Sequence, residues 1–149
     1  LFTMANLSAL ETLIGLAQRD TDAAAKKLGA ELAAVDEANQ KLTMLHGYRD
    51  DYAHKLEAAQ RNGITPLAYH NFVAFMGKLD NAINGQREVI KHAEAKAAMA
   101  KTTWQAAERK RLSYRTLSER AAAETLRVEN KRDQKQMDEH AARQAYYKK

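Results

Sequence analysis

The chain has 149 residues, a length that favours a single domain. Charged residues make up 29%, and 24 Lys and Arg against 19 Asp and Glu give a net charge of +5. There is no cysteine, which excludes disulfides and thiolate metal sites. One proline and six glycines are too few turn residues for a sheet protein, and the abundance of Ala, Glu, Lys, Leu and Arg is typical of long helices or coiled coils.

The start of the chain, LFTMANLSALETL, lacks the basic and apolar regions of a secretory signal. No stretch approaches the roughly 18 consecutive apolar residues of a membrane span. We therefore expect a cytoplasmic protein. Residues 1–3 precede Met4, the more natural start, and we expect them to be an addition to the natural chain.

Apolar residues in the first part of the chain recur three and four positions apart, which places them on one face of a helix. With a small phase shift after Leu28, the stripe consists of Leu7, Leu10, Ile14, Ala17, Thr21, Ala24, Leu28, Leu32, Val35, Leu42, Leu45, Tyr48, Tyr52 and Leu56. This pattern predicts a helix from about residue 5 to residue 60.

The second part of the chain has a more regular pattern, a heptad repeat typical of a supercoiled seam. Its steps of four and three run through Phe72, Met76, Leu79, Ile83, Gln86, Ile90, Ala93, Ala97, Ala100, Trp104, Ala107, Arg111 and Tyr114. Beyond Tyr114 the seam weakens into Ser118, Ala121, Thr125 and Val128. The pattern predicts a helix from about residue 67 to residue 145.

The only proline, Pro66, lies in a short breaker segment between the two patterns. Asn62-Gly63 suits a helix end, and Thr65-Pro66 suits a helix start with threonine as N-cap. A turn over about residues 61–66 is so short that the two helices must be antiparallel. The sequence therefore predicts an all-α fold, an antiparallel two-helix coiled-coil hairpin formed as a single domain by residues 4–149.

At a rise of 1.5 Å per residue, the first predicted helix is about 80 Å long and the second is about 120 Å long. Folding about residue 64 brings Leu7 near position 121. Residues beyond about 121 then have no partner within the chain, and we expect an overhanging C-terminal helix.

The sequence offers no candidate catalytic or metal site. The five histidines form no HxxxH pair, and there is no glycine-rich phosphate loop. A two-helix hairpin has no concave pocket that would shift a pKa or exclude water. We expect neither an enzyme nor a bound cofactor or metal.

The residues next to the turn carry more apolar surface than a seam needs. Phe75, Leu79, Ala82 and Gln86 form a stripe beside the seam, across from Leu45, Tyr48, Tyr52 and Leu56. Two interpretations stay open. In the first, the surplus apolar surface is buried, through wider local packing or in a dimer. In the second, it is an exposed protein-binding patch.

Charge is unevenly distributed, with a net −3 in residues 1–60 and +8 in residues 61–149. The run Glu108–Gln136 has nine Lys and Arg against five Asp and Glu. It is either a solvated helix face or a surface for an acidic partner. Two functions can be considered from the residues alone: a basic coiled coil that binds nucleic acid, which the near absence of interleaved aromatic residues disfavours, and a homodimer forming a four-helix bundle.

Four stretches of the chain together resemble the flagellar export protein FliJ family. ENKRDQKQMDEHAARQA, with its DQKxMDE core from Asp133 to Glu139, is similar to the family's C-terminal signature. ALETLIGLAQRDTDAAAKKLG, starting at Ala9, is similar to the family's opening, and KLTMLHGYRDDY and NGITPLAYHNFVAFMGKLDNAI fit its middle. The resemblance covers nearly the whole chain from Met4 onward.

The resemblance implies a two-helix antiparallel coiled coil, similar to the central stalk of rotary ATP synthases. Members are soluble components of the flagellar type III secretion apparatus. They bind and promote the hexameric export ATPase FliI, contact the cytoplasmic domain of the export gate FlhA and escort empty export chaperones. It also implies a cytoplasmic location, peripheral to the inner-membrane export apparatus through protein contacts, and no nucleic-acid partner.

The resemblance also assigns candidate binding residues. Those expected to bind the export gate are Leu45, Tyr48, Tyr52, Phe75, Leu79 and Ala82. Those expected to bind the ATPase are Arg109, Lys110, Arg111, Arg115, Arg120, Arg127, Lys131 and Arg132. Lys41 and Gln86 stand where other members carry different polar residues, and no role is assigned to them.

Overall fold

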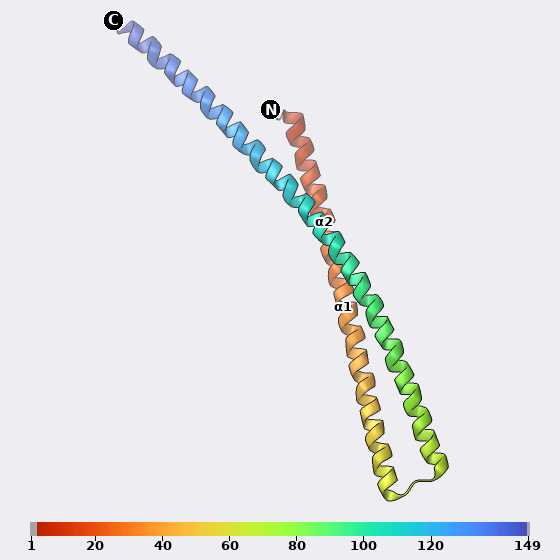
Figure 1. Cartoon of the computed structure of the whole chain (residues 1–149). Coiled ribbons are helices and arrows are strands. Elements are labelled where there is room, and N and C mark those ends of the chain that lie inside the picture. The colour runs from red at the N-terminus through yellow and green to blue at the C-terminus, as the bar shows by residue number, and fades with distance from the viewer. Residues whose placement is uncertain (1–2, 149) are drawn as a thin grey trace. The chain divides into compact units, whose positions relative to one another are not determined.

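The computed structural model describes residues 3–148. Within them the chain forms two α-helices, α1 (Met4–Asn62) and α2 (Pro66–Tyr147), joined by residues 63–65, with no strand in the described part (Figure 1). The predicted all-α helical hairpin is confirmed. The expectation that residues 1–3 are additional to the natural chain falls partly on Leu1 and Phe2, which lie outside the described residues.

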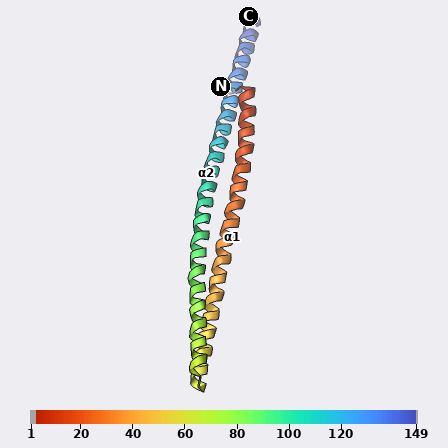
Figure 2. The same ribbon diagram turned by 90° about the vertical axis from the view of Figure 1, so that its right-hand side faces the viewer.

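Contacts divide the chain into two units. Unit 1 consists of residues 3–22 and 105–148, and unit 2 of residues 23–104. In unit 2 the α1 and α2 segments run antiparallel from the turn and lie side by side (Figure 1 and Figure 2). The organisation as a single domain stays a prediction.

The turn of unit 2 is built from the residues that the sequence indicated. Gly63 follows the end of α1 with a φ of 91°, the left-handed conformation that glycine adopts at little cost. Pro66 is the first residue of α2, and the backbone N–H of Ala68 donates a hydrogen bond to the Thr65 hydroxyl at 3.2 Å. Thr65 is thus the N-cap that satisfies one of the free N–H groups at the start of α2.

Burial along α1 follows an unbroken alternation of three- and four-residue steps, so the expected phase shift after Leu28 is wrong. Glu31 and Ala38 occupy the seam positions, whereas Leu32 is 53% exposed. A supercoiled pair keeps one seam at 3.5 residues per turn, and this register decides which residues face the partner helix, whatever their individual hydrophobicity. The seam residues of α1, all buried or half-buried, are Leu7, Leu10, Ile14, Ala17, Thr21, Ala24, Leu28, Glu31, Val35, Ala38, Leu42, Leu45, Arg49, Tyr52, Leu56 and Ala59. His46 and Ala53 are half-buried outside this alternation.

The α2 seam is as predicted from Phe72 to Tyr114, where every seam position is buried or half-buried. It continues through Ser118, the buried Ala121 and the half-buried Val128. Thr125 is exposed and Glu124 takes the half-buried position, so this single assignment is wrong.

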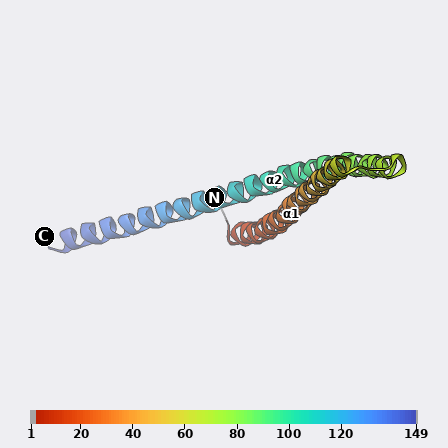
Figure 3. The same ribbon diagram turned by 90° about the horizontal axis from the view of Figure 1, so that it is seen from below.

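The overhang of α2 is present within unit 1. Residues 129–148 are all exposed, and the helix continues to Tyr147 without a neighbouring helix in the described chain (Figure 3). Exposure begins after Val128 and not near position 121, so the overhang is shorter than expected.

Candidate protein-binding surfaces

Aromatic side chains gather in unit 2 near the turn. The Tyr52 ring lies 5.0 Å from the Phe72 ring and 4.5 Å from the Phe75 ring, between centroids, in tilted geometry. A shallow hollow of about 270 Å³ adjoins this cluster, lined by Tyr48, Asp51, Tyr52, Lys55, Phe75 and Leu79. A partner side chain can enter the hollow, which has an aromatic wall and one charge of each sign at its rim.

The six residues expected to bind the export gate, called here the turn-side patch, divide into two sets. Tyr48, Phe75 and Ala82 are exposed on the helix flank, at 53% and 43% for the two aromatic residues. Leu45, Tyr52 and Leu79 are half-buried in the seam beneath them. Tyr48 therefore lies outside the seam, contrary to its place in the predicted α1 stripe. The structure brings four of the six, all except Leu45 and Ala82, to the same hollow.

Two polar links between α1 and α2 border this patch. Arg49 Nε donates a hydrogen bond to Asp80 Oδ1, and this contact raises the pKa of the Arg49 guanidinium. Gln86 Nε2 donates to the carbonyl oxygen of Ala38 at 2.9 Å. Gln86 thus has a structural contact in the seam, where the heptad pattern placed it, although the sequence assigned it no role.

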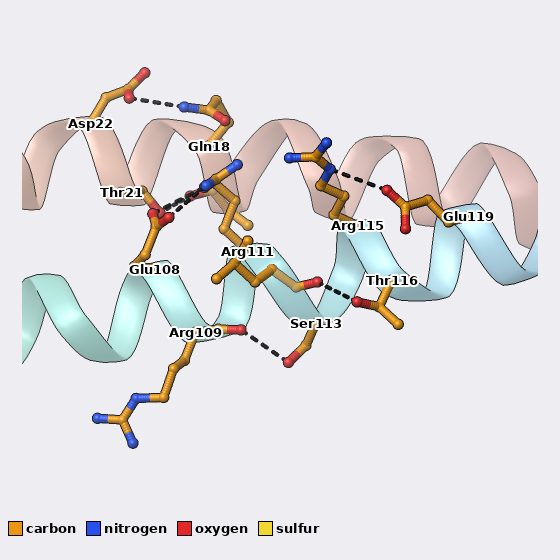
Figure 4. Close-up of polar contacts among 12 residues, drawn as sticks. Gln18, Thr21, Asp22, Glu108, Arg109, Arg111, Ser113, Arg115, Thr116 and Glu119 are labelled. Atoms are coloured by element: carbon orange, nitrogen blue, oxygen red, sulfur yellow. Dashed lines mark hydrogen bonds and ion pairs between the residues drawn. The ribbon is translucent and has the colours of Figure 1, made fainter.

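The eight cationic residues expected to bind the ATPase, called here the basic set, all lie on the α2 part of unit 1. Three of them have carboxylate partners within one helical turn: Arg111 with Glu108, Arg115 with Glu119, and Arg127 with Glu124. Figure 4 shows the first two pairs, with the Glu108–Arg111 pair lying beside Thr21 of α1.

These pairs alter the acidity of two carboxyl groups. The hydrogen bond from Arg111 lowers the pKa of Glu108, against a smaller effect of desolvation. The hydrogen bond from Arg127 likewise lowers the pKa of Glu124. Both carboxylates therefore stay charged and neutralise their arginines at neutral pH.

The other five members of the basic set have no carboxylate within ion-pair distance among residues 3–148: Arg109, Lys110, Arg120, Lys131 and Arg132. Lys110 Nζ lies 6.0 Å from the centroid of the Tyr114 ring. Within the basic set, the positive charge available to a partner is therefore carried by these five side chains, a division that the sequence alone did not reveal.

A second hollow, of about 320 Å³, lies in unit 2 away from the turn. It is lined by Ala24, Lys27, Glu31, Lys96, Met99, Ala100 and Thr103. None of these residues was a predicted site residue. The signal that could have indicated it is the heptad register, which brings Lys27 and Lys96 to the same flank of the pair.

The described residues contain no group of three or more His, Asp or Glu side chains placed to hold a metal ion. Among residues 3–148 no helix is long and apolar enough to cross a membrane.

The two packed helices define the class of the protein, an all-α helical hairpin of the coiled-coil type. The family model described as "Flagellar FliJ protein" matches residues 6–149. The chain therefore belongs to the FliJ family of flagellar proteins. It is 34% identical to the flagellar FliJ protein of Salmonella typhi and 33% identical to that of Escherichia coli K12, in each case over 97% of this chain and 99% of the relative.

Among solved structures, the hairpin is similar to that of CT670 from Chlamydia trachomatis, a proposed YscO homologue. The TM-score is 0.48 at 16% identity, covering 93% of this chain and 90% of CT670.

Proposed function

We propose that this chain is a non-catalytic component of the flagellar type III protein export apparatus. In this role it binds and promotes the hexameric export ATPase, contacts the cytoplasmic domain of the export gate and escorts export chaperones. The observation that carries the proposal is the match to the FliJ family over residues 6–149. The proposal includes a cytoplasmic location, peripheral to the inner membrane through protein contacts alone.

The basic set of unit 1 is the proposed ATPase-binding surface. Its support is physical: five cations on the α2 part of unit 1 have no carboxylate partner in the described chain, and two of them, Lys131 and Arg132, lie in the exposed overhang. Such charges favour a partner that presents acidic or polar groups and raise the rate of encounter with it. Binding to the assembled ring and not to its free subunits would promote the ring by mass action.

The turn-side patch of unit 2 is the proposed gate-binding surface. The exposed Tyr48 and Phe75 side chains and the adjoining hollow support it, because large aromatic residues at the rim of a hollow are typical centres of protein interfaces. The two proposed surfaces lie in different units, so each can be altered without changing residues of the other.

ATP hydrolysis by a purified flagellar export ATPase, with and without the full chain, tests the first part of the proposal. We expect hydrolysis to increase with chain concentration and to saturate. No change in hydrolysis, together with no co-elution of the two proteins, would contradict ATPase binding.

Capture of the export gate's cytoplasmic domain by the full chain tests the second part. The double variant Tyr48→Ala/Phe75→Ala should lose capture while keeping its helicity. Leu32→Ala/Val73→Ala is the matched control, because both residues are exposed and apolar in unit 2 but lie outside the turn-side patch. Equal capture by the two double variants would show that the gate binds elsewhere.

A further inference from the structure

One flank of unit 2 differs from the other in charge and in shape. In an antiparallel pair, the residues that directly precede the first seam position of each heptad meet along one flank. On α1 and α2 these positions are all exposed: Lys27, Ala34, Lys41, Tyr48, Lys55, Phe75, Ala82, Val89, Lys96 and Thr103. We call this set the lysine flank.

The lysine flank contains four lysines and no carboxylate. None of Lys27, Lys41, Lys55 and Lys96 has an ion-pair partner among residues 3–148. The opposite flank carries both signs, with Asp80, Arg87, Glu94 and Lys101, and Asp80 is paired with Arg49. The lysine flank thus has four cations and no carboxylate, whereas the opposite flank has two cations and two carboxylates.

Lys27 and Lys96 show this imbalance most directly, because they come from different helices and line the same hollow. Like charges facing each other across a helix pair are unfavourable unless an anion lies between them. The one carboxylate in that hollow, Glu31, is half-buried in the seam and has no ion-pair partner in the described chain. Carboxylates from a partner would relieve the repulsion between the two lysines.

The shape of the lysine flank fits a helix. Two hollows of unit 2 with mainly apolar lining lie on it, one beside Met99 and one beside Phe75. Between the two hollows, the small side chains of Ala34 and Ala82 allow another helix to approach closely. Val89, which is 52% exposed, adds apolar surface there. From Lys27 to Lys55 the flank spans four heptads, about 42 Å at the helical rise.

We propose that the lysine flank binds one acidic, amphipathic α-helix of a partner protein, which lies along unit 2 as a third strand of the coiled coil. Its apolar side chains enter the hollows beside Met99 and Phe75, and its carboxylates pair with Lys27, Lys96 and Lys41. Asp51, at the rim of the hollow near the turn, disfavours an acidic residue at that one point. The lysine flank shares Tyr48, Phe75 and Ala82 with the turn-side patch, so the inference extends that proposed surface along unit 2. It goes beyond the proposed export role, because it specifies a class of partner, an acidic helix, and a binding mode that requires no flagellar protein.

A designed peptide provides the probe. It is roughly four heptads long, with Leu at both seam positions and Glu at the flanking positions, so that repulsion between its own charges keeps it from self-associating. Mixed with the full chain at low salt, it should gain helicity by circular dichroism and bind in titration calorimetry. A peptide with Lys in place of Glu should not bind. Failure of the acidic peptide to bind or to become helical would overturn the proposal.

Two charge-matched variants locate the binding. Lys27→Glu/Lys96→Glu should weaken peptide affinity about tenfold or more, while Lys26→Glu/Lys101→Glu, outside the lysine flank, should weaken it at most slightly. Met99→Gln tests the apolar contact without a charge change and should also weaken binding. Each variant is first checked for unchanged helicity.

Equal effects of the two charge variants would mean that net charge alone attracts the peptide, and would overturn the proposal. The same holds if a double-stranded DNA oligonucleotide displaces the peptide at equal concentration, because the flank would then be a general polyanion surface. Because no flagellar protein takes part, these outcomes leave the ATPase and gate tests unaffected.

Discussion

Gln86 Nε2 donates a hydrogen bond to the backbone carbonyl oxygen of Ala38, 2.9 Å away across the seam of unit 2. The contact requires a small residue at position 38, because Ala38 is buried at 6% exposure and its methyl group lets the amide of Gln86 approach the α1 backbone. A polar side chain at a seam position, with its hydrogen bond satisfied, favours one register of the helix pair over others.

Ala38→Leu should therefore destabilise the hairpin by about 1–3 kcal/mol, because the larger side chain displaces Gln86 and crowds the seam. Ala30→Leu is the control, since Ala30 is exposed on the same helix and in the same unit. Urea unfolding followed by circular dichroism gives both free energies of unfolding. Equal stability of the two variants would mean that the seam at position 38 can accommodate a leucine side chain.

The sequence was sufficient for the fold because the single proline and an Asn-Gly pair lie close together at the reversal between the helices. Gly63 and Pro66 could be assigned from local conformational preference alone, and the α2 heptads could be read directly. The register of α1 could not, because Leu32 is more apolar than Glu31 and only the pairing of the helices decides which of them is buried.

The candidate surfaces were less predictable for the same reason. Tyr48 belongs to an apolar stripe in the sequence, yet the register turns it to the flank. The ion pairs that neutralise Arg111, Arg115 and Arg127 depend on side-chain conformation, so composition shows only a basic run. The opposition of Lys27 and Lys96 requires knowing which residues of two helices meet.

The corrected register makes a quantitative prediction. Ile83→Ala should lower the free energy of unfolding by about 2–4 kcal/mol, because the Ile83 side chain is only 4% exposed and its removal leaves a cavity in the seam. Leu32→Ala should lower the free energy of unfolding by less than about 0.5 kcal/mol, since Leu32 is largely exposed. Urea unfolding compares the two, and a larger cost at Leu32 would restore the phase shift that the sequence suggested.

The turn predicts opposite effects for two glycine substitutions. Gly63→Ala should destabilise the hairpin by about 1–2 kcal/mol, because a Cβ is strained at a φ of 91°. Gly77→Ala should stabilise it by about 0.5–1 kcal/mol, since Gly77 lies in the interior of α2 and an added Cβ meets no atom within 4 Å. Thermal melts should shift in opposite directions, and a shift in the same direction would contradict the assigned turn.

The Glu108 and Glu124 pairs predict a dependence of stability on pH. Each carboxyl has a pKa in the folded chain below its ordinary value of 4.5, because an arginine hydrogen-bonds its charged form. Their stabilising contribution is therefore fully present above pH 4.5 and is lost as the pH falls through the lowered values. Melting temperatures from about pH 7 down to about pH 3 should fall less for Glu108→Gln/Glu124→Gln than for the unaltered chain.

Glu94→Gln is the control for the pH experiment, because Glu94 forms no ion pair within the described residues. It should reproduce the acid-induced fall of the unaltered chain. An identical fall in all three proteins would mean that neither arginine contact contributes to acid sensitivity.

The division of the basic set into paired and unpaired cations predicts which of them matter for the ATPase. Arg109→Gln/Arg120→Gln removes two exposed charges that have no carboxylate partner in the described chain, and should reduce both stimulation of ATP hydrolysis and its salt dependence. Arg115→Gln/Arg127→Gln removes two charges that Glu119 and Glu124 already neutralise, so it should have the smaller effect. The net charge change is the same in both variants, so a difference between them reports on position and pairing. If the paired set proves the more important, the export ATPase must break these ion pairs to bind, and the surface it recognises is not the one that is free in the isolated chain.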